Sequence, residues 1–347
     1  MTSGIIAQQP SKPIVIRVKT DNPGYSDLNS IIIPAKYHTN TSIPNRCIID
    51  WGDGIREDYA TSSTSQYTHT YSAPGEYVIR IYGQFAGFYY SNLNTVDRLK
   101  LIELVSLGNT SRFSPNQDGA FSGCSNMIVS ANLHPFNFIT SAVNIFSNCT
   151  NIITLNNVTF ENVVNGEYMF AYCTNLVNIP LATFTKLKQG RCTFQATGIK
   201  NLPFATFSEL TDGDSTFSSA MIENLPLATF EKLATATSMF RNSKIKNLPL
   251  AQFNLINSGA YMLDACTGIT ELPSARFDNL GNGERMLRSV PLTTASYSKI
   301  LKDLDTYNIK TGVTFNASAS KYDSTAVTAR ANLVARGWTI SDSGLQT

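Results

Sequence analysis

A segment of twelve residues occurs three times, with small differences, in the middle of the chain. IKNLPFATFSEL, IENLPLATFEKL and IKNLPLAQFNLI begin at residues 199, 222 and 245. A landmark Phe or Leu recurs at spacings of 23–25 residues, at Phe121, Phe146, Phe170, Phe194, Phe217, Phe240, Leu263 and Leu287. A fixed period of this size indicates stacked supersecondary units, because one unit alone cannot bury its apolar side.

Each unit has the form F-x-x-C/small, then I-x-x-L-P-L, then A-T-F-x-x-L. The middle segment matches the strand pattern of leucine-rich repeats, and the period suits that class. The core rung expected for the central unit consists of Ile222, Leu225, Leu227, Phe230 and Leu233. The recurring proline cannot donate to a ladder, which predicts short strands that end just before it.

Two sets of polar residues hold equal positions in successive units. One set alternates in charge, and comprises Lys200, Glu223 and Lys246; the other comprises Asn201, Asn224 and Asn247. Stacking in order would make opposite charges neighbours, at roughly 0.2–1 kcal/mol per pair, and would let the amides hydrogen-bond along a ladder. For the charges, the alternative is that their alternation on a solvated surface arises by chance. For the amides, the alternative is a polar strip that binds glycan or protein. All six are candidate binding-surface residues.

Three early units, GAFSGCSNM, NIFSNCTNI and YMFAYCTNL, resemble the F-x-x-C-x-x-L units of BspA-type leucine-rich repeats. The segment LIELVSLGNTSRFSPNQDGAF resembles the opening of related bacterial surface-protein repeats. This resemblance covers roughly residues 100–290 and implies a leucine-rich-repeat solenoid in a family mostly described as adhesive. The later units depart from it, because Thr197, Ala220 and Ser243 stand where the family has Cys.

Residues 13–95 contain short β-rich runs broken by Gly, Pro and Asn, which predict an all-β immunoglobulin-like sandwich. DWGDG (50–54) and YTHTYSAPGEYVIRI (67–81) resemble motifs of the polycystic kidney disease (PKD) domain, which implies that Trp51 packs in the core. Asp50 and Asp53 have two interpretations: a calcium site or acid/base pair, and a turn capped by its own side chains. A full calcium shell needs about 6–8 oxygens, which favours the turn.

The segment GQFAGFYYSNLN (83–94) joins the two modules and is rich in aromatic residues. Its four aromatics are Phe85, Phe88, Tyr89 and Tyr90. One interpretation is an exposed adhesive patch. The other is packing between the sandwich and the repeats. The four residues complete the candidate binding surface.

Residues 292–347 are predicted to form a small α/β capping segment. TTASYSKILKDLDTY has helical spacing, GVTFNAS reads as a strand, and a second helix starts at Asp323 or Ser324 and ends before Gly337, ahead of a strand at WTI. LVARGWTISDSG resembles the ends of phage-encoded repeat proteins, which implies a virion location. The predicted organisation is an arm (1–12), a sandwich (13–95), a solenoid of about eight coils (96–291) and this cap.

Composition excludes several functional classes. A net charge of +2 does not favour nucleic acid, and the chain has no 18-residue apolar run for membrane insertion. The first residues lack the basic and apolar regions of a signal peptide. Six cysteines without zinc spacing, four of them at one repeat position, are expected to be free thiols.

We expect no enzyme, cofactor or metal site. His38, His69 and His134 fall into no catalytic order, and no phosphate-binding or nucleophile motif occurs. The sequence favours a non-enzymatic bacteriophage virion protein, a tail or capsid accessory or fibre-type component, which attaches to host-surface glycan or protein or to other virion proteins. The alternatives are a bacterial cell-surface or secreted adhesin and a glycan-active enzyme with a repeat appendage. Ligand, binding face and oligomeric state stay open.

Overall fold

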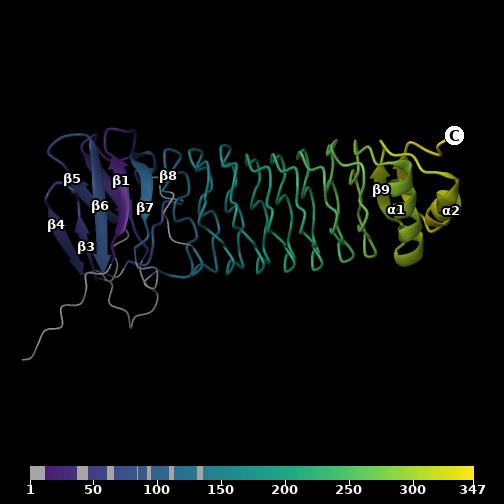
Figure 1. Cartoon of the computed structure of the whole chain (residues 1–347), viewed down its shortest axis with the longest axis horizontal. Coiled ribbons are helices and arrows are strands. Elements are labelled where there is room, and N and C mark those ends of the chain that lie inside the picture. Colours follow the sequence, from purple (N-terminus) through teal and green to yellow (C-terminus); the bar gives the residue numbers. More distant parts are fainter. Residues whose placement is uncertain are drawn as a thin grey trace, which may run out of the picture.

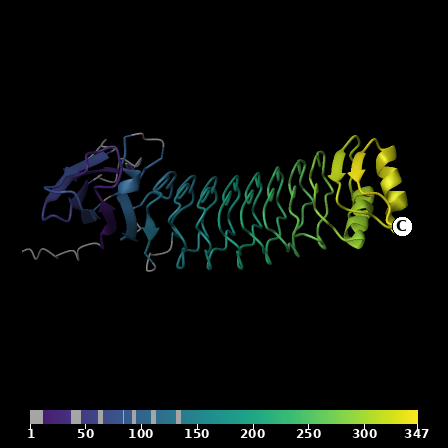
Figure 2. The ribbon, with the colours of Figure 1, turned by 90° about the horizontal axis from the view of Figure 1, so that it is seen from above.

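The computed structural model describes residues 12–36, 46–60, 66–83, 85–91, 95–108, 113–130 and 136–347. Residues 1–11 of the predicted N-terminal arm, and also His38 and His134, lie outside the described residues. The molecule is elongated, with a β-sheet at one end, stacked coils in the middle and two helices at the other end (Figures 1 and 2).

The N-terminal end is all-β. Its larger sheet has the order β4-β3-β6-β1-β7-β8, and a separate antiparallel pair is formed by β2 and β5. The strands are β1 (Ile14–Lys19), β2 (Ser30–Pro34), β3 (Arg46–Asp50), β4 (Arg56–Ala60), β5 (Gln66–Thr70), β6 (Glu76–Gly83), β7 (Leu101–Ser106) and β8 (Ile128–Val129). Trp51 is fully buried in this core, as predicted. An immunoglobulin-like sandwich is only partly present, because the second sheet has two strands and the first continues into the repeats.

Two columns of phenylalanine rings run through the stacked coils. The landmark rings from Phe121 to Phe240 lie parallel, with neighbouring centroids 5.2–5.8 Å apart. The A-T-F rings from Phe136 to Phe277 form the second column, at 5.6–6.0 Å. Rings of the two columns meet edge to face. The stacked aromatic core predicted from the repeat is confirmed.

Around each landmark residue the backbone is a run of tight turns rather than a strand. Alternate N–H groups, from Gly166, Tyr168, Phe170 and Tyr172, donate to carbonyls of the next coil, those of Gln189, Arg191, Thr193 and Gln195. Tyr168 and Tyr172 have φ values of 54° and 63°, and the same two positions are left-handed in later coils. Left-handed backbone is unfavourable for L residues by roughly 1–2 kcal/mol and is incompatible with an extended strand.

The prediction of a leucine-rich-repeat solenoid is therefore wrong. Between residues 136 and 291, all of them described, there is no strand, and the I-x-x-L-P-L segment supplies only single bridging residues such as Asn201, Asn224 and Asn247. A proline two residues after each bridge has no N–H with which to continue a ladder. The sheets of the described chain are small, and only two α-helices accompany them. The repeats form a stack of turn-rich coils instead.

The predicted C-terminal elements are confirmed. They are α1 (Thr294–Tyr307), β9 (Thr314–Ala317), α2 (Val327–Ala335) and β10 (Thr339–Asp342). A short 3₁₀ turn precedes α2, and Asp323 caps it by accepting from the Thr325 N–H at 2.8 Å. The last coil donates to β9 through Gly283 at 2.8 Å and Leu287 at 2.9 Å. β9 therefore occupies the place of one further coil.

All six cysteines are free and buried, as expected. Burial raises the pKa of Cys266 to about 11 and that of Cys173 to about 12. Because the thiolate is the reactive form, we expect no alkylation of the native protein by iodoacetamide at pH 8 during an exposure that labels all six thiols in urea. Mass spectrometry measures this, and rapid labelling of any thiol in the native protein would contradict it.

Candidate functional site

A ladder of asparagine amides runs along the coils. The Asn224 Nδ2 donates to the Asn201 Oδ1 at 2.9 Å, and the Asn247 Nδ2 donates to the Asn224 Oδ1 at 2.8 Å. Parallel backbone bridges join the same residues. The predicted ladder is confirmed. Each amide in it still has at least one N–H and one lone pair beyond those used in the ladder.

The charged column beside the amides is also stacked in register. The Lys246 Nζ lies 2.6 Å from the Glu223 Oε2, and its hydrogen bond lowers the pKa of Glu223. A second alternating column contains the equivalent pair between Lys232 and Glu209, also at 2.6 Å. Opposite charges on adjacent coils are therefore neighbours, as predicted. Lys200 has no ion-pair partner among the residues that the structure describes.

An exposed apolar stripe borders the ladder. The residue after each recurring proline is partly exposed: Leu181 44%, Phe204 52%, Leu227 41% and Leu250 44%. The prediction that Leu227 belongs to the core is wrong, because the tight turn at Pro226 directs the next residue outward. The sequence signal was present in the recurring Pro-Leu or Pro-Phe pair, since a proline was already expected to end the buried segment.

Polar residues bound this stripe at both ends. Asn157 holds the equivalent position in the coil before Leu181, and Ser274 holds it in the coil after Leu250. We define the ladder face as the amide ladder, Asn178 at the equivalent position one coil earlier, the charged column and the apolar stripe with its prolines. This face comprises Asn178, Pro180, Leu181, Lys200, Asn201, Pro203, Phe204, Glu223, Asn224, Pro226, Leu227, Lys246, Asn247, Pro249 and Leu250.

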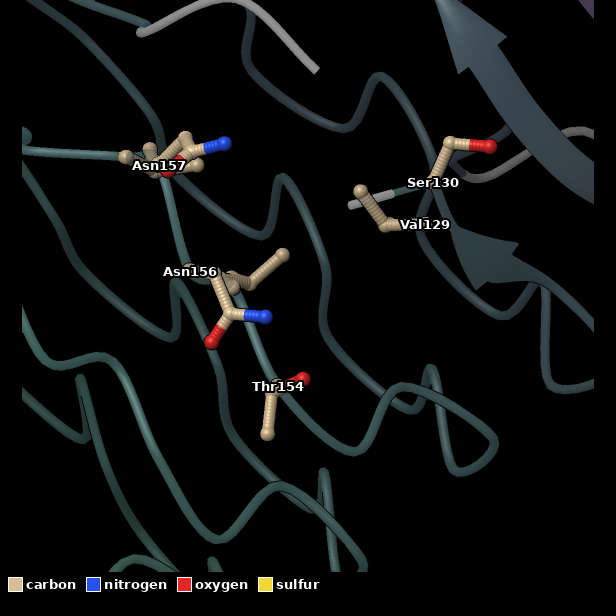
Figure 3. A pocket seen from close by; sticks show the side chains of 7 residues that line it. Val129, Ser130, Thr154, Asn156 and Asn157 are labelled. Carbon is tan, nitrogen blue, oxygen red and sulfur yellow. The ribbon is translucent and has the colours of Figure 1, made fainter. Parts of the chain in front are cut away.

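A small hollow lies at the N-terminal end of the ladder face. Figure 3 shows Thr154, Asn156 and Asn157 on one coil, with Val129 and Ser130 across from them. The hollow has a volume of about 50 Å³. Ligand pockets measure roughly 300–1,000 Å³, and a water in bulk takes about 30 Å³, so this hollow suits one or two waters. The regular face is thus a better candidate than the hollow.

The aromatic segment does not form an exposed patch. Phe88 and Tyr90 are fully buried and Phe85 is 4% exposed, so their assignment to a binding surface is wrong. Phe88 packs against Phe121 of the first coil, with the two tilted rings 5.2 Å apart between centroids, which confirms the packing interpretation. Tyr89 is half-buried, with the Lys36 ammonium 5.5 Å from its ring centroid.

The carboxylates of DWGDG stabilise their own turn. Asp50 accepts from the Gly52 N–H at 3.1 Å and pairs with Arg56 at 2.8 Å. Asp53 accepts from the Ile55 N–H at 3.0 Å and lies 2.8 Å from the His69 Nε2. The capped-turn interpretation is confirmed by these contacts. No cluster of three metal-ligating side chains occurs within the described ranges.

Comparisons with known proteins give no relative for this chain: no family model, no curated protein and no solved structure matches it. Helices long and apolar enough to cross a membrane are not found in the described part of the chain. The ladder face and its geometry are therefore the features from which a function can be inferred.

Proposed function

We propose that the chain is a non-enzymatic structural protein of a bacteriophage particle, a tail or capsid accessory or fibre-type component. It attaches to other virion proteins or to the host surface through the side of its rod. The observation that supports this proposal is the ladder face, where amides, charges and apolar side chains repeat coil after coil. An exposed apolar strip with a polar border is typical of a surface that binds a macromolecule.

The proposal predicts that the protein is part of purified infectious particles of the phage that carries its gene. Mass spectrometry of gradient-purified virions should detect it at a fixed ratio to the major capsid protein. Phe204→Asp on the ladder face should reduce its incorporation or the adsorption of the particles to host cells. Leu255→Asp is the matched control, because Leu255 is equally exposed at 51% but belongs to another column.

Absence of the chain from particles would overturn the virion role. Antibody labelling of intact bacteria that express the gene would then test the cell-surface alternative. Equal incorporation and adsorption of both aspartate variants would show that the ladder face is not the attachment surface.

A further inference from the structure

The exposed stripe has a midpoint through which a two-fold axis can relate two copies of the chain. It contains four apolar residues on four consecutive coils and is bounded by Asn157 and Ser274. Its midpoint lies between the coils that present Phe204 and Leu227. A two-fold axis through that midpoint, perpendicular to the rod, maps the stripe onto itself in a second, antiparallel copy. An interface of this isologous kind is the commonest in homo-oligomers.

The same axis brings opposite charges together. It places Phe204 opposite Leu227 of the other copy, and it also places Lys200 opposite Glu223 of the other copy. Lys200 is the member of the column that has no ion pair within the described chain, whereas Glu223 is already paired with Lys246. The charge of Lys200 already contributes to lowering the pKa of Glu223 in its own chain, and the symmetric contact adds the Glu223 of the other copy to each Lys200. The amides of Asn201 and Asn224 also come to face each other.

Other antiparallel registers fit less well. An axis through the coil of Leu227 would set Lys200 against Lys246 and Glu223 against its own copy, so like charges would meet. An axis between the coils of Leu227 and Leu250 would keep opposite charges together but would set Phe204 against Ser274. Only the central register pairs all four apolar residues while it sets Lys200 against Glu223; Lys246 then lies opposite the uncharged Val177.

The repeat distance also favours a second copy over an extended peptide. Stacked coils joined by backbone hydrogen bonds repeat at roughly 4.8 Å, whereas a strand lying along the rod rises about 3.4 Å per residue. A peptide would thus lose register within a few coils. A second rod has the same spacing and matches every rung.

We propose that the ladder face binds the ladder face of a second copy of this chain, antiparallel, about an axis between the coils of Phe204 and Leu227. The inference deepens the proposed function, on which it rests, by naming the partner of that face. The face provides about 15 residues per copy, against roughly 20–30 in a standard interface, so a weak dimer with a dissociation constant on the order of micromolar is expected.

Charge reversal tests the pairing directly. Lys200→Glu and Glu223→Lys each place two like-charge pairs in the dimer, and each variant should weaken self-association on the order of tenfold. A mixture of the two variants restores both opposite pairs and should form a heterodimer as stable as the wild-type dimer. Sedimentation velocity of the purified full chain across a concentration series measures all three. Lys232→Glu, in another column, is the control and should leave the dimer unchanged.

A cross-link tests the register. Phe204→Cys mixed with Leu227→Cys should give a disulfide-linked heterodimer under mild oxidation, in higher yield than either variant alone. Preferential linkage of each variant with itself would indicate a parallel dimer and overturn the proposal. The native cysteines do not interfere, because all six are buried.

Three further results would overturn the proposal: a wild-type protein that stays monomeric at every concentration, charge variants that associate as well as wild type, or a mixture that stays monomeric. A protein that binds glycan or peptide but stays monomeric at every concentration would therefore also overturn the proposal. Self-association is measured without phage, so its failure is separate from that of the virion role. A monomer found in particles contradicts only the dimer, and a dimer missing from particles contradicts only the virion role.

Discussion

Replacing Lys100 by methionine is expected to lower the free energy of unfolding of the N-terminal end by about 3–5 kcal/mol, as for other broken buried ion pairs. Lys100 and Asp97 both have fully buried side chains, with the Lys100 Nζ 3.9 Å from the Asp97 Oδ1. The Nζ also donates to the Ser26, Asp27 and Ser30 carbonyls at 2.9, 2.7 and 3.0 Å. Methionine fills similar space but removes the ammonium donor from these carbonyls and the neighbouring cation from the buried Asp97 carboxylate.

Asp97 explains why the loss should reach beyond one contact. Its carboxylate accepts from the Tyr25 and Ser26 N–H groups at 2.8 and 2.9 Å and from the Ile32 N–H of β2 at 2.7 Å. The pair therefore joins the loop before β2 to the 3₁₀ turn Arg98–Lys100, which leads into β7. Without Lys100 the buried carboxylate keeps these N–H donors but loses its neighbouring cation.

Urea denaturation followed by Trp51 fluorescence measures the effect, in a Trp338→Phe background that removes the only other tryptophan. Lys19→Met is the matched control. Its ion pair with Asp21 is slightly shorter, at 3.6 Å, but both side chains are about two-fifths exposed, so a loss below about 1 kcal/mol is expected. Equal effects of the two variants would show that the buried pair contributes no more than a surface one.

Phe217→Ala is expected to destabilise the stacked coils by about 3–5 kcal/mol, the usual range for a buried phenylalanine. Phe217 is fully buried, with ring centroids of Phe194 and Phe240 at 5.3 and 5.2 Å and Phe207 edge-on at 5.5 Å. Because each coil contacts only its neighbours, a cavity here weakens the packing between the coils before Phe217 and the coils after it.

Phe204→Ala is the control for this substitution. Phe204 is the same residue type one coil earlier, but it is 52% exposed on the ladder face. Its replacement should change stability by no more than about 0.5 kcal/mol. Thermal unfolding by circular dichroism compares the two variants, and a similar fall in both would contradict the assignment of Phe217 to the core and of Phe204 to the surface.

Much of the stack could be predicted from the period alone. Equal positions become neighbours in any ordered stack, so the Phe columns, the Asn ladder and the Glu223–Lys246 pair follow without knowledge of the backbone. The C-terminal helices and strands were also within reach, because their spacing and capping signals are local.

Local conformation was harder to predict. The I-x-x-L-P-L spacing fits a strand, yet the coil is closed by left-handed residues that are not glycine, such as Tyr168 and Cys192, and these carry no sequence signal. The pattern also counts Leu227 as apolar without showing that a turn exposes it. Lys100 and Asp97 look like surface charges, since their partners are backbone groups about 70 residues away.

Because the β9 strand takes the place of a further coil, the length of the stack can change without a change at its end. Both ends of the stack are closed by their own elements, while every inner coil offers its neighbours the same hydrogen bonds. Adding or deleting one repeat unit would thus move the N-terminal sheet and the C-terminal helices apart or together by one step of roughly 4.8 Å, with both closures intact. The number of repeats in the sequence therefore sets the distance between the N-terminal sheet and the C-terminal helices.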